Sequence, residues 1–326
     1  MQRAMDVIRA VALLLAAVSA LAAILSLGGA FNNDLDILTH LTPVWLAMSL
    51  VALILLGLAG FSTSRGVPVM ASVTIGICAW LMVPELIARV TAPRFPAADQ
   101  TVKIIQFNVW DHNRDPTATA RWILDQDADI VVLEETGHGA IPATLAGRYP
   151  FRAPCDKGPE GCATTILAKS LPADGGQLMW TKLGRRHAGA WATLGAGAQA
   201  FTIVGTHYRW PEPLAAQVHQ ARRFADVILR FDRKSLIVVG DFNMTPWSFA
   251  LKRQDARFGL TRLTHAIFTF PAGRIATWGG MTFPFPLLPI DQVYVGPDWR
   301  PVSIRRGPAM GSDHYPIVVT LTRQIR

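Results

Sequence analysis

The chain has 326 residues, a formal net charge of +8 at pH 7 and a hydrophobic fraction of 51%. This length allows one large domain or two ordinary ones. The mean hydropathy is positive, which argues against an entirely soluble chain and directs attention to long apolar segments.

Three long segments without any charged residue precede residue 90. They cover residues 10–31, 41–61 and 66–84 and contain 22, 21 and 19 residues, whereas a helix needs about 20 residues to cross a bilayer. A signal peptide would explain the first segment but not the two that follow it. The sequence therefore predicts a transmembrane region over residues 1–90 and a Pro-containing linker over 91–101. A second domain is expected over 102–326.

The basic residues near these segments predict an orientation. The first loop, residues 32–40, contains two Asp and no Lys or Arg, whereas Arg3, Arg9 and Arg65 lie at the opposite ends of the segments. Basic residues favour the cytoplasmic side, so three crossings predict a multi-pass protein of the inner membrane with a periplasmic C-terminal domain. Arg89 and Arg94 lie on the outer side and weaken this inference.

The positive charge belongs to the C-terminal part of the chain. Residues 1–100 contain five basic and five acidic side chains, which leaves 26 basic and 18 acidic side chains in the remainder. A basic domain near a membrane favours anionic partners such as lipid headgroups, polyphosphates or nucleic acid. A moderate positive charge also simply improves solubility.

The three cysteines fall in two contexts. Cys78 lies within the third apolar segment, where a small apolar packing residue is expected. Cys155 and Cys162 lie in the Pro- and Gly-rich stretch APCDKGPEGCAT. In an oxidising compartment this spacing would allow a disulfide, and two unrelated free thiols are the alternative. The spacing does not fit a metal-binding CxxC motif.

The second domain alternates β-rich and helical patterns. Segment 115–127 has Asp115 as a candidate N-cap and Pro116 at the first helical position, both of which are helix start signals. Segment 212–232 is long and amphipathic. Strands are expected at 103–110, 129–136, 164–169, 189–194, 201–208, 235–242, 292–296 and 315–322. Many strands with interspersed helices predict two sheets between helical layers.

Polar residues stand at the ends of these expected strands. The segment VVGDFNMTPWS places Asp241 and Asn243 two positions apart, so that they would face the same way in a strand. Taken singly, such residues are ordinary turn formers. Together with Asn108, Glu134, Glu135, His207, Asp291, Asp313 and His314, they provide the oxygen ligands, amides and imidazoles that a hard divalent cation and a phosphate ester require.

The series Asn108, DIVVLEE, GTHYRWP, GDFNMTPW, IDQVYV and GSDHYP resembles the endonuclease/exonuclease/phosphatase superfamily, which has the DNase I-like fold. The resemblance extends over about residues 102–324. More narrowly, the chain is similar to bacterial members of the superfamily that carry N-terminal membrane helices. It implies a four-layer α/β/β/α sandwich, within the α/β class, that hydrolyses phosphoesters with Mg²⁺ or Mn²⁺.

The resemblance also implies a role for each residue. Glu135 would be the principal metal ligand, with Asn108 close by as a further metal ligand and Asp313 supporting a metal or the water. Asp241 would align or deprotonate the attacking water, Asn243 would hold the phosphate or that water, and His314, fixed by Asp291, would stabilise the phosphorane. His207 would protonate the leaving group. Glu134 stands where the family usually has Gln, so it would either add charge near the metal or point away.

Several substrate classes remain open at this point. The three apolar helices favour a lipid headgroup or lipid-linked phosphate, and the loop MTFPFPLLP at 281–289 would suit membrane contact or packing against its own domain. A nuclease acting outside the cytoplasm is the alternative, supported by Arg pairs at 185, 222 and 305, which also suit solvated faces. A non-catalytic sensor or scaffold is the third reading, although every expected site position is filled.

Overall fold

The computed structural model describes residues 2–60, 65–97, 101–137, 139–153, 164–178, 189–211, 214–275, 281–282 and 284–324. Cys155 and Cys162 lie outside these described residues, and so does the first of the three Arg pairs. The chain forms two compact units. One consists of Met1–Val90 with Met244–Arg253, and the other of Thr91–Asn243 with Gln254–Arg326.

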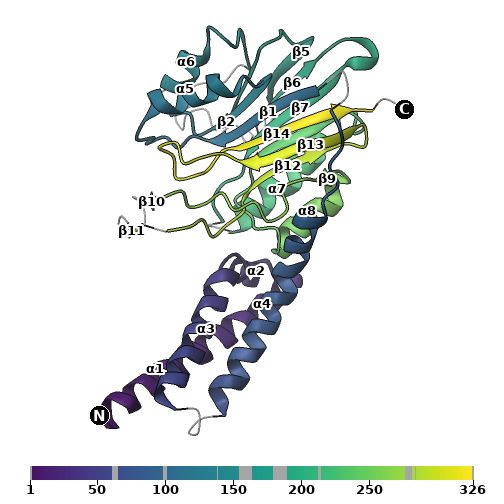
Figure 1. The fold of residues 1–326 in the computed structure, drawn as a ribbon. Coiled ribbons are helices and arrows are strands. Elements are labelled where there is room, and N and C mark those ends of the chain that lie inside the picture. Colours follow the sequence, from purple (N-terminus) through teal and green to yellow (C-terminus); the bar gives the residue numbers. More distant parts are fainter. Residues whose placement is uncertain are drawn as a thin grey trace. The chain divides into compact units, whose positions relative to one another are not determined.

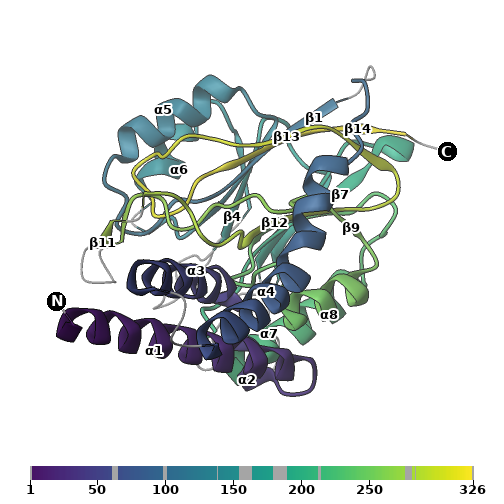
Figure 2. The same cartoon turned by 60° about the horizontal axis from the view of Figure 1, so that its bottom comes forward.

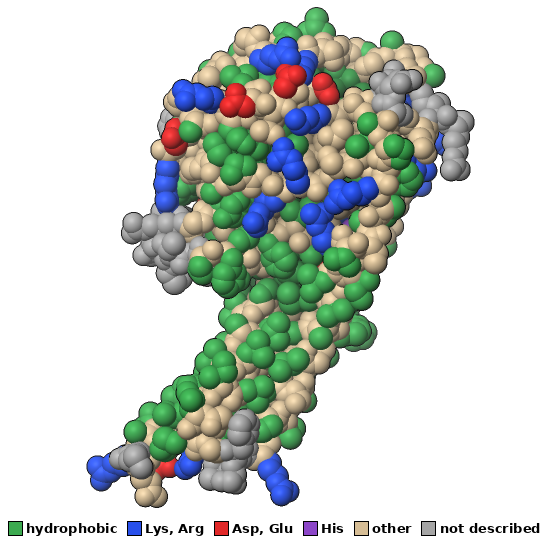
Figure 3. Space-filling view, in the orientation of Figure 1, with side chains coloured by type: hydrophobic (Ala, Val, Ile, Leu, Met, Phe, Trp, Pro, Cys, Tyr) green, Lys and Arg blue, Asp and Glu red, His purple; other side chains and the backbone are tan. Residues whose placement is uncertain are grey.

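The first unit contains three helices that are long and apolar enough to cross a membrane: α1 (Gln2–Leu27), α3 (Thr42–Ala59) and α4 (Gly66–Thr91). The prediction of three such helices is confirmed, but two of the helices extend well beyond their expected bounds. α1 begins at Gln2 rather than near residue 10, and α4 continues past Pro84. Large apolar side chains of these helices are exposed (Figure 3), as expected of helices that face lipid.

Small residues bring the first helices of this unit together. Ala16 of α1 is fully buried in a cluster with Ala52 and Leu56 of α3 and with Val67 of α4. Close approach through small side chains is the usual way in which helices pack when lipid offers no hydrophobic driving force. Several small residues of the apolar segments are thus buried together with Leu56 and Val67, whereas many of their other large side chains are exposed.

The loop between α1 and α3 contains structure that the sequence analysis did not foresee. The short helix η1 (Gly28–Ala30) is followed by α2 (Asn33–His40), whose N-terminus is capped by the Asn32 side chain. The α2 residue Asp36 is almost fully buried and accepts hydrogen bonds from the backbone N–H groups of Phe249 and Ala250, at 2.9 and 2.6 Å. The Trp247 indole also donates to the Thr39 carbonyl oxygen, at 2.7 Å.

The second unit is a sandwich of two six-stranded sheets. The first sheet has the order β13 (Trp299–Arg306), β14 (Ile317–Arg323), β1 (Thr101–Asn108), β2 (Ile130–Glu134), β4 (Thr164–Ala168), β3 (Phe151–Arg152). The second has the order β5 (Asp174–Leu178), β6 (Gly189–Leu194), β7 (Phe201–His207), β8 (Ile237–Asp241), β12 (Asp291–Val295), β9 (Thr261–Arg262). β1 pairs in parallel with β2, and β7 with β8, whereas the other neighbours are antiparallel.

Helices cover the outer faces of the two sheets (Figures 1 and 2). α5 (Pro116–Gln126) and α6 (Ala140–Leu145) lie against the first sheet, and α7 (Leu214–Ile228) lies against the second. The remaining elements are η3 (Gly197–Gln199), α8 (Phe249–Phe258), and the ladder of β10 (Arg274–Ile275) with β11 (Met281–Thr282). The predicted four-layer sandwich is confirmed.

The local signals that predicted individual elements also hold. The Asp115 side chain accepts from the backbone N–H of Ala118 at 2.9 Å, which is the expected N-cap of α5. All eight expected strands are present. β3, β5, β9, β10, β11 and β13, together with α6 and α8, were not predicted, because most of them are short or lack a strong apolar alternation.

The sandwich has three apolar layers. Between the sheets lies a core of aliphatic side chains, including Ile104, Val132, Ile203 and Val239. A second cluster, including Phe107 and Ile123, lies between the first sheet and its helices. On the outer face of the second sheet, aromatic rings pack edge to face or tilted: Tyr208, Phe224, Phe242, Phe258 and Tyr294.

Candidate active site

The alternation of strand side chains places the candidate residues on the face between the two sheets. Ile104 of β1 belongs to the core between the sheets, so the two-residue repeat puts Gln106 and Asn108 on the same face. By the same repeat Glu134 ends β2 on this face. The other contributors are His207, Asp241 and Asp291, at the ends of β7, β8 and β12.

Strand pairing then brings these ends together. Asn108 is directly opposite Glu134 in the first sheet, whereas Asp241 lies opposite both His207 and Asp291 in the second. The polar residues therefore cluster at one end of the space between the sheets, next to an apolar core. Gly240 is required at this position, because its φ of +152° and the adjacent Thr206 carbonyl oxygen leave no room for a Cβ.

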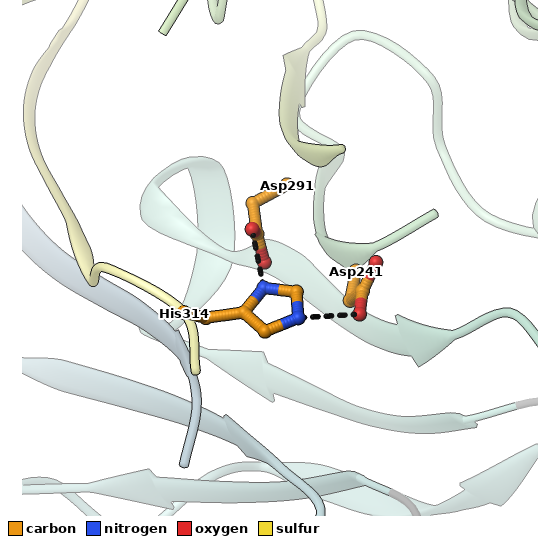
Figure 4. Close-up of side chains that lie close together, drawn as sticks. All are labelled: Asp241, Asp291 and His314. Carbon is orange, nitrogen blue, oxygen red and sulfur yellow. Dashed lines mark hydrogen bonds and ion pairs between the residues drawn. The ribbon is translucent and has the colours of Figure 1, made fainter. Parts of the chain in front are cut away.

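His314 lies between two carboxylates (Figure 4). Its Nδ1 is 2.8 Å from Asp291 Oδ2, and its Nε2 is 3.6 Å from Asp241 Oδ2. Burial by itself would lower the pKa of His314, but the charges of Asp291 and Asp241 raise this pKa well above its usual value. The arrangement therefore favours a protonated imidazole that can donate a hydrogen bond to an anion.

Asp241 and Asn243 are close together, but not because a strand continues through them. β8 ends at Asp241, and Asn243 has a φ of +48°. The backbone N–H of Asn243 donates to Asp241 Oδ1 at 2.8 Å, and the Asn243 amide nitrogen is 3.4 Å from Asp241 Oδ2. An Asx-type turn thus produces the proximity that was expected from strand alternation.

Asn108 connects the two carboxylates that face the site. Its amide nitrogen is 3.0 Å from Glu135 Oε1 and 3.0 Å from Asp241 Oδ2. Its Oδ1 accepts from the backbone N–H of Trp110 at 3.0 Å. In this arrangement Asn108 orients carboxylates with its nitrogen, whereas the sequence-based assignment as a metal ligand needs its oxygen.

Glu135 and Glu134 occupy different environments although they are adjacent. Glu135 follows the end of β2 with a φ of +50°, and its side chain is 29% exposed and lies 3.5 Å from His207 Nε2. Glu134 is fully buried and accepts from the Gln106 amide nitrogen at 3.0 Å. Burial raises the pKa of Glu134 well above its usual value, and the nearby Asp291 and Asp241 raise it further.

Asp313 and His207 complete the set of candidate residues. His207 Nε2 is 3.7 Å from Asp241 Oδ2 and 3.5 Å from the Asn243 amide nitrogen. The Asp313 carboxylate is 3.5 Å from Ser312 Oγ. Burial raises the pKa of Asp313, the adjacent His314 lowers it, and the charge of Glu135 raises it, so the Glu135 and Asp313 carboxylates repel each other.

The donor set fits a hard divalent cation. Ligand atoms of Asp241, Asp291 and His314 lie within 4.8 Å of one another, but His314 and Asp291 are bonded to each other and so are poorly placed to share an ion. Glu135, which shares the Asn108 amide with Asp241, and the neighbouring Asp313 offer further carboxylate oxygens. Burial raises the pKa of Asp241 to about 6. A divalent cation would offset this concentration of negative charge.

Gln106 was missed by the sequence analysis. Its amide nitrogen is 2.7 Å from Asp291 Oδ1 and 3.0 Å from Glu134 Oε2. The signal was present in the segment KIIQFN, where a polar residue stands on the inward-facing side of an otherwise apolar strand. An inward-facing Gln is neither ionisable nor nucleophilic, so its role becomes visible only through its hydrogen-bond partners.

Comparison with solved structures shows related folds at low sequence identity. Sphingomyelinase C from Streptomyces griseocarneus has 19% identity and a TM-score of 0.50, covering 68% of this chain and 99% of that chain. A double mutant of beta toxin from Staphylococcus aureus with bound magnesium ions has 12% identity and a TM-score of 0.53, covering 69% and 100%. TDP2 from D. rerio, complexed with a single strand DNA product, has 17% identity and a TM-score of 0.51, covering 69% and 100%.

No curated relative matches the chain by sequence. The model of the Endonuclease/Exonuclease/phosphatase family matches residues 105–314. This stretch is more than half of the chain and contains every candidate site residue described above. The chain belongs to the Endonuclease/Exonuclease/phosphatase family.

Proposed function

We propose that this protein is a membrane-anchored, divalent-metal-dependent phosphoesterase. Family membership supports hydrolysis of a phosphate ester. The observation that carries the proposal is the buried His314, which is paired with Asp291 at 2.8 Å and lies 3.6 Å from Asp241 at the ends of paired strands. This arrangement offers a proton acceptor and an anion-binding donor side by side.

Glu135 and Asp313 would hold the cation, with Asn108 beside them. When bound, Mg²⁺ or Mn²⁺ would neutralise the negative charge of the phosphate and so favour attack by a nucleophile. The presence of magnesium in the related beta toxin structure supports this choice of ion. The excess of carboxylates over cationic side chains in the candidate site supports it independently.

The protein side chains would then divide the proton transfers. Asp241 accepts the proton of the attacking water as the new phosphorus–oxygen bond forms, and Asn243 orients the phosphate or this water. His314 donates a hydrogen bond to the phosphoryl oxygen that gains negative charge, while Asp291 holds its ring. His207, 3.7 Å from Asp241, gives a proton to the leaving oxygen as its bond to phosphorus breaks.

We favour a lipid headgroup or a lipid-linked phosphate as the substrate. The indole of Trp210 is 43% exposed and lies 6.1 Å from the ring of Phe270, which in turn is 5.0 Å from the His314 ring. An exposed aromatic surface next to the site suits an apolar or cationic substituent. The three membrane-length helices and the sphingomyelinase neighbour support the same reading.

The apolar loop at 281–289 contributes in two ways. Leu288 packs against Phe270 and Ile290 within its own domain, whereas Phe285 is 61% exposed. The packing of Leu288 agrees with the interpretation that this loop packs against its own domain. The exposed Phe285 is available for contact with the bilayer, and we include such contact in the proposal.

The proposal is tested with the purified full-length protein in lipid nanodiscs. Hydrolysis of bis(p-nitrophenyl) phosphate is measured with Mg²⁺, with Mn²⁺ and after chelation by EDTA. Glu135→Ala should lose nearly all activity and also the Mg²⁺-dependent rise in thermal stability, because it removes an oxygen ligand. Asp125→Asn removes an exposed carboxylate of α5 and is the matched control. Activity that persists in EDTA or in the Glu135 variant would refute metal-dependent hydrolysis.

A nuclease is the second candidate function, because the TDP2 neighbour holds a DNA product and the net charge of +8 lies in the catalytic part of the chain. The two are separated by assaying phospholipid and sphingomyelin vesicles beside single-stranded DNA and RNA. Preferential release of a phosphorylated headgroup supports the lipid proposal. Preferential cleavage of nucleic acid would support the nuclease, and no cleavage of any phosphoester would support a non-catalytic scaffold.

A further inference from the structure

A polar bridge crosses the interior of the sandwich directly beneath the candidate site. Gln106 projects from β1 of the first sheet, and its amide nitrogen donates to Asp291 Oδ1 on β12 of the second sheet, at 2.7 Å. The same nitrogen donates to Glu134 Oε2 at 3.0 Å. The next inward-facing residue of β1 is Ile104, so the bridge lies between the apolar core and the site.

The bridge meets the carboxylate that holds His314. Asp291 uses Oδ2 for His314 Nδ1, at 2.8 Å, and Oδ1 for Gln106. Asp291 is 1% exposed and Gln106 is 1% exposed, so bulk water is not available to replace this hydrogen bond. A buried carboxylate that loses a donor becomes costly to keep ionised and is free to rotate.

Two atoms of the bridge lack hydrogen-bond partners among the described residues: Gln106 Oε1 and Glu134 Oε1. A Gln that served only to satisfy buried polar groups would be expected to use its oxygen as well. Instead both observed hydrogen bonds of this side chain run from its nitrogen to carboxylate oxygens. This pattern favours orientation of Asp291 over simple filling of the interior.

We propose that Gln106 is a positioning residue that fixes the Asp291 carboxylate against His314, and that Glu134 holds the Gln106 amide in the required orientation. The inference rests on the proposed phosphoesterase function for its kinetic consequence. Gln106 does not contact the reacting groups. It acts through Asp291, which sets the ring orientation of His314.

The first test is Gln106→Met, which keeps a side chain of similar length but removes both hydrogen bonds. The kcat value should fall about 10- to 100-fold, as is typical of lost outer-shell partners, while KM and the Mg²⁺ dependence stay within about twofold of the wild type. In a His314→Ala background the same change should have little further effect, because its target is gone. A wild-type kcat for Gln106→Met, or an undiminished effect without His314, would overturn the proposal.

Gln292→Met is the matched control. Gln292 is also buried. Its side-chain oxygen accepts a hydrogen bond from the Thr264 hydroxyl, and its side-chain nitrogen donates one to the Pro289 carbonyl oxygen rather than to Asp291. It should lower thermal stability by as much as Gln106→Met does while kcat changes little. An equal loss of kcat in both variants would show that general destabilisation, not positioning, explains the effect.

A swapped pair provides a second variant. Gln106→Glu with Glu134→Gln keeps an amide opposite a carboxylate but places a carboxylate next to Asp291. Because Asp291 Oδ1 then faces a second carboxylate instead of a donor, kcat should stay as low as in Gln106→Met, although the pair keeps the same groups and the same net charge. Recovery of kcat to the wild-type value would overturn the positioning role.

A spectroscopic readout separates this inference from the proposed function. The Nδ1 proton resonance of His314, assigned with His314→Ala in ¹⁵N-histidine-labelled protein, should move upfield in Gln106→Met and not in Gln292→Met. This shift would support the Gln106–Asp291–His314 link even if no phosphoester were cleaved, in which case the proposed function alone would fail. An unmoved resonance would overturn the link whatever the activity.

Discussion

The ring of His314 is held by contacts on both of its nitrogens, 2.8 Å from Asp291 and 3.6 Å from Asp241. If this protonated imidazole donates to the phosphoryl oxygen, His314→Ala should lower kcat by roughly 10² to 10³, the loss typical of a preorganised donor facing developing charge. Steady-state kinetics with a soluble phosphodiester would measure this.

Asp291→Asn is expected to cause a loss of the same order, because an amide cannot support the positive charge on His314. Circular dichroism should show that both variants remain folded. Near-normal turnover of the two folded variants would remove His314 from the proposed mechanism.

Asp241 should titrate at an unusually high pH in the metal-free protein. Burial raises the pKa of this carboxyl to about 6, with a further increase from Asp291 that is countered by the two histidines and the Asn243 N–H. Because the folded-state pKa lies above the unfolded value, the stability contributed by the protonated form is lost as the pH rises through about 6.

A bound cation would reverse this loss by favouring the ionised carboxylate. The increase in melting temperature caused by Mg²⁺ should therefore be larger at pH 7.5 than at pH 5. Carboxyl ¹³C NMR, with Asp241→Asn for assignment, should give a pKa near 6 without Mg²⁺ and a lower one with it. A pKa near 4 in the metal-free protein would contradict the prediction.

At the scale of elements, the ends of strands and helices decide where the functional groups point. Glu135 and Asn243 both adopt positive φ just beyond a strand, a conformation that is uncommon for residues other than glycine and that concentrates at functional sites. The turn after β2 redirects Glu135, which the two-residue repeat would have placed on the opposite face from Glu134, whereas the turn after β8 keeps Asn243 beside Asp241 although the strand has ended. The paired strands thus bring the candidate residues to one end of the sandwich, and the turns after β2 and β8 set the directions of the Glu135 and Asn243 side chains.

In the helical unit, the Asp36 side chain caps the start of another helix. This carboxylate from α2 accepts from the Phe249 and Ala250 N–H groups at the start of α8, and Arg253 lies 3.5 Å from it. A cap of this kind contributes about 0.5–2 kcal/mol. Asp36→Ala should therefore lower the free energy of unfolding by about 1–2 kcal/mol, which is measured by thermal or denaturant unfolding in detergent.

Asp34→Ala is the control for this measurement, because Asp34 lies on the same helix and is exposed. It should change stability by less than about 0.5 kcal/mol. Equal effects of the two substitutions would show that charge in α2, rather than capping of α8, accounts for the change.

At the scale of the whole molecule, the distribution of basic residues predicts the topology. Arg9 donates to the Ala59 carbonyl oxygen at 2.9 Å, so the start of α1 and the end of α3 lie at one end of the helical unit, where Figure 3 shows Lys and Arg side chains. Since basic residues favour the cytoplasmic side, we expect this end to be cytoplasmic and the catalytic domain to be periplasmic in a bacterial cell.

Alkaline phosphatase fused after Arg326 should be active, whereas the same enzyme fused after Arg65 should be inactive. In intact cells, Cys155 and Cys162 should resist a membrane-impermeant thiol reagent until they are reduced, as expected of a disulfide in an oxidising compartment. Activity of only the Arg65 fusion would overturn the topology. Thiols that react without reduction on a periplasmic domain would refute the disulfide alone.

The sequence by itself determined the features that depend on local pattern. Apolar segments of 22, 21 and 19 residues can satisfy their backbone groups in lipid only as helices, and the three membrane-length helices follow from that. Alternating strands predicted the two-sheet sandwich, and Asp115 with Pro116 predicted the start of α5. The resemblance carried by the GDFN and SDH motifs predicted the family.

Only the tertiary structure decided which of these residues meet, because contacts between distant segments depend on register and turns rather than on local propensity. The Asp241–Asn243 proximity comes from a turn, and the amide nitrogen of Asn108, rather than its oxygen, faces Glu135. Gln106 became visible through partners 28 and 185 positions away. A side chain whose role depends on such distant partners has no local signal, and the packing of the two sheets supplies it.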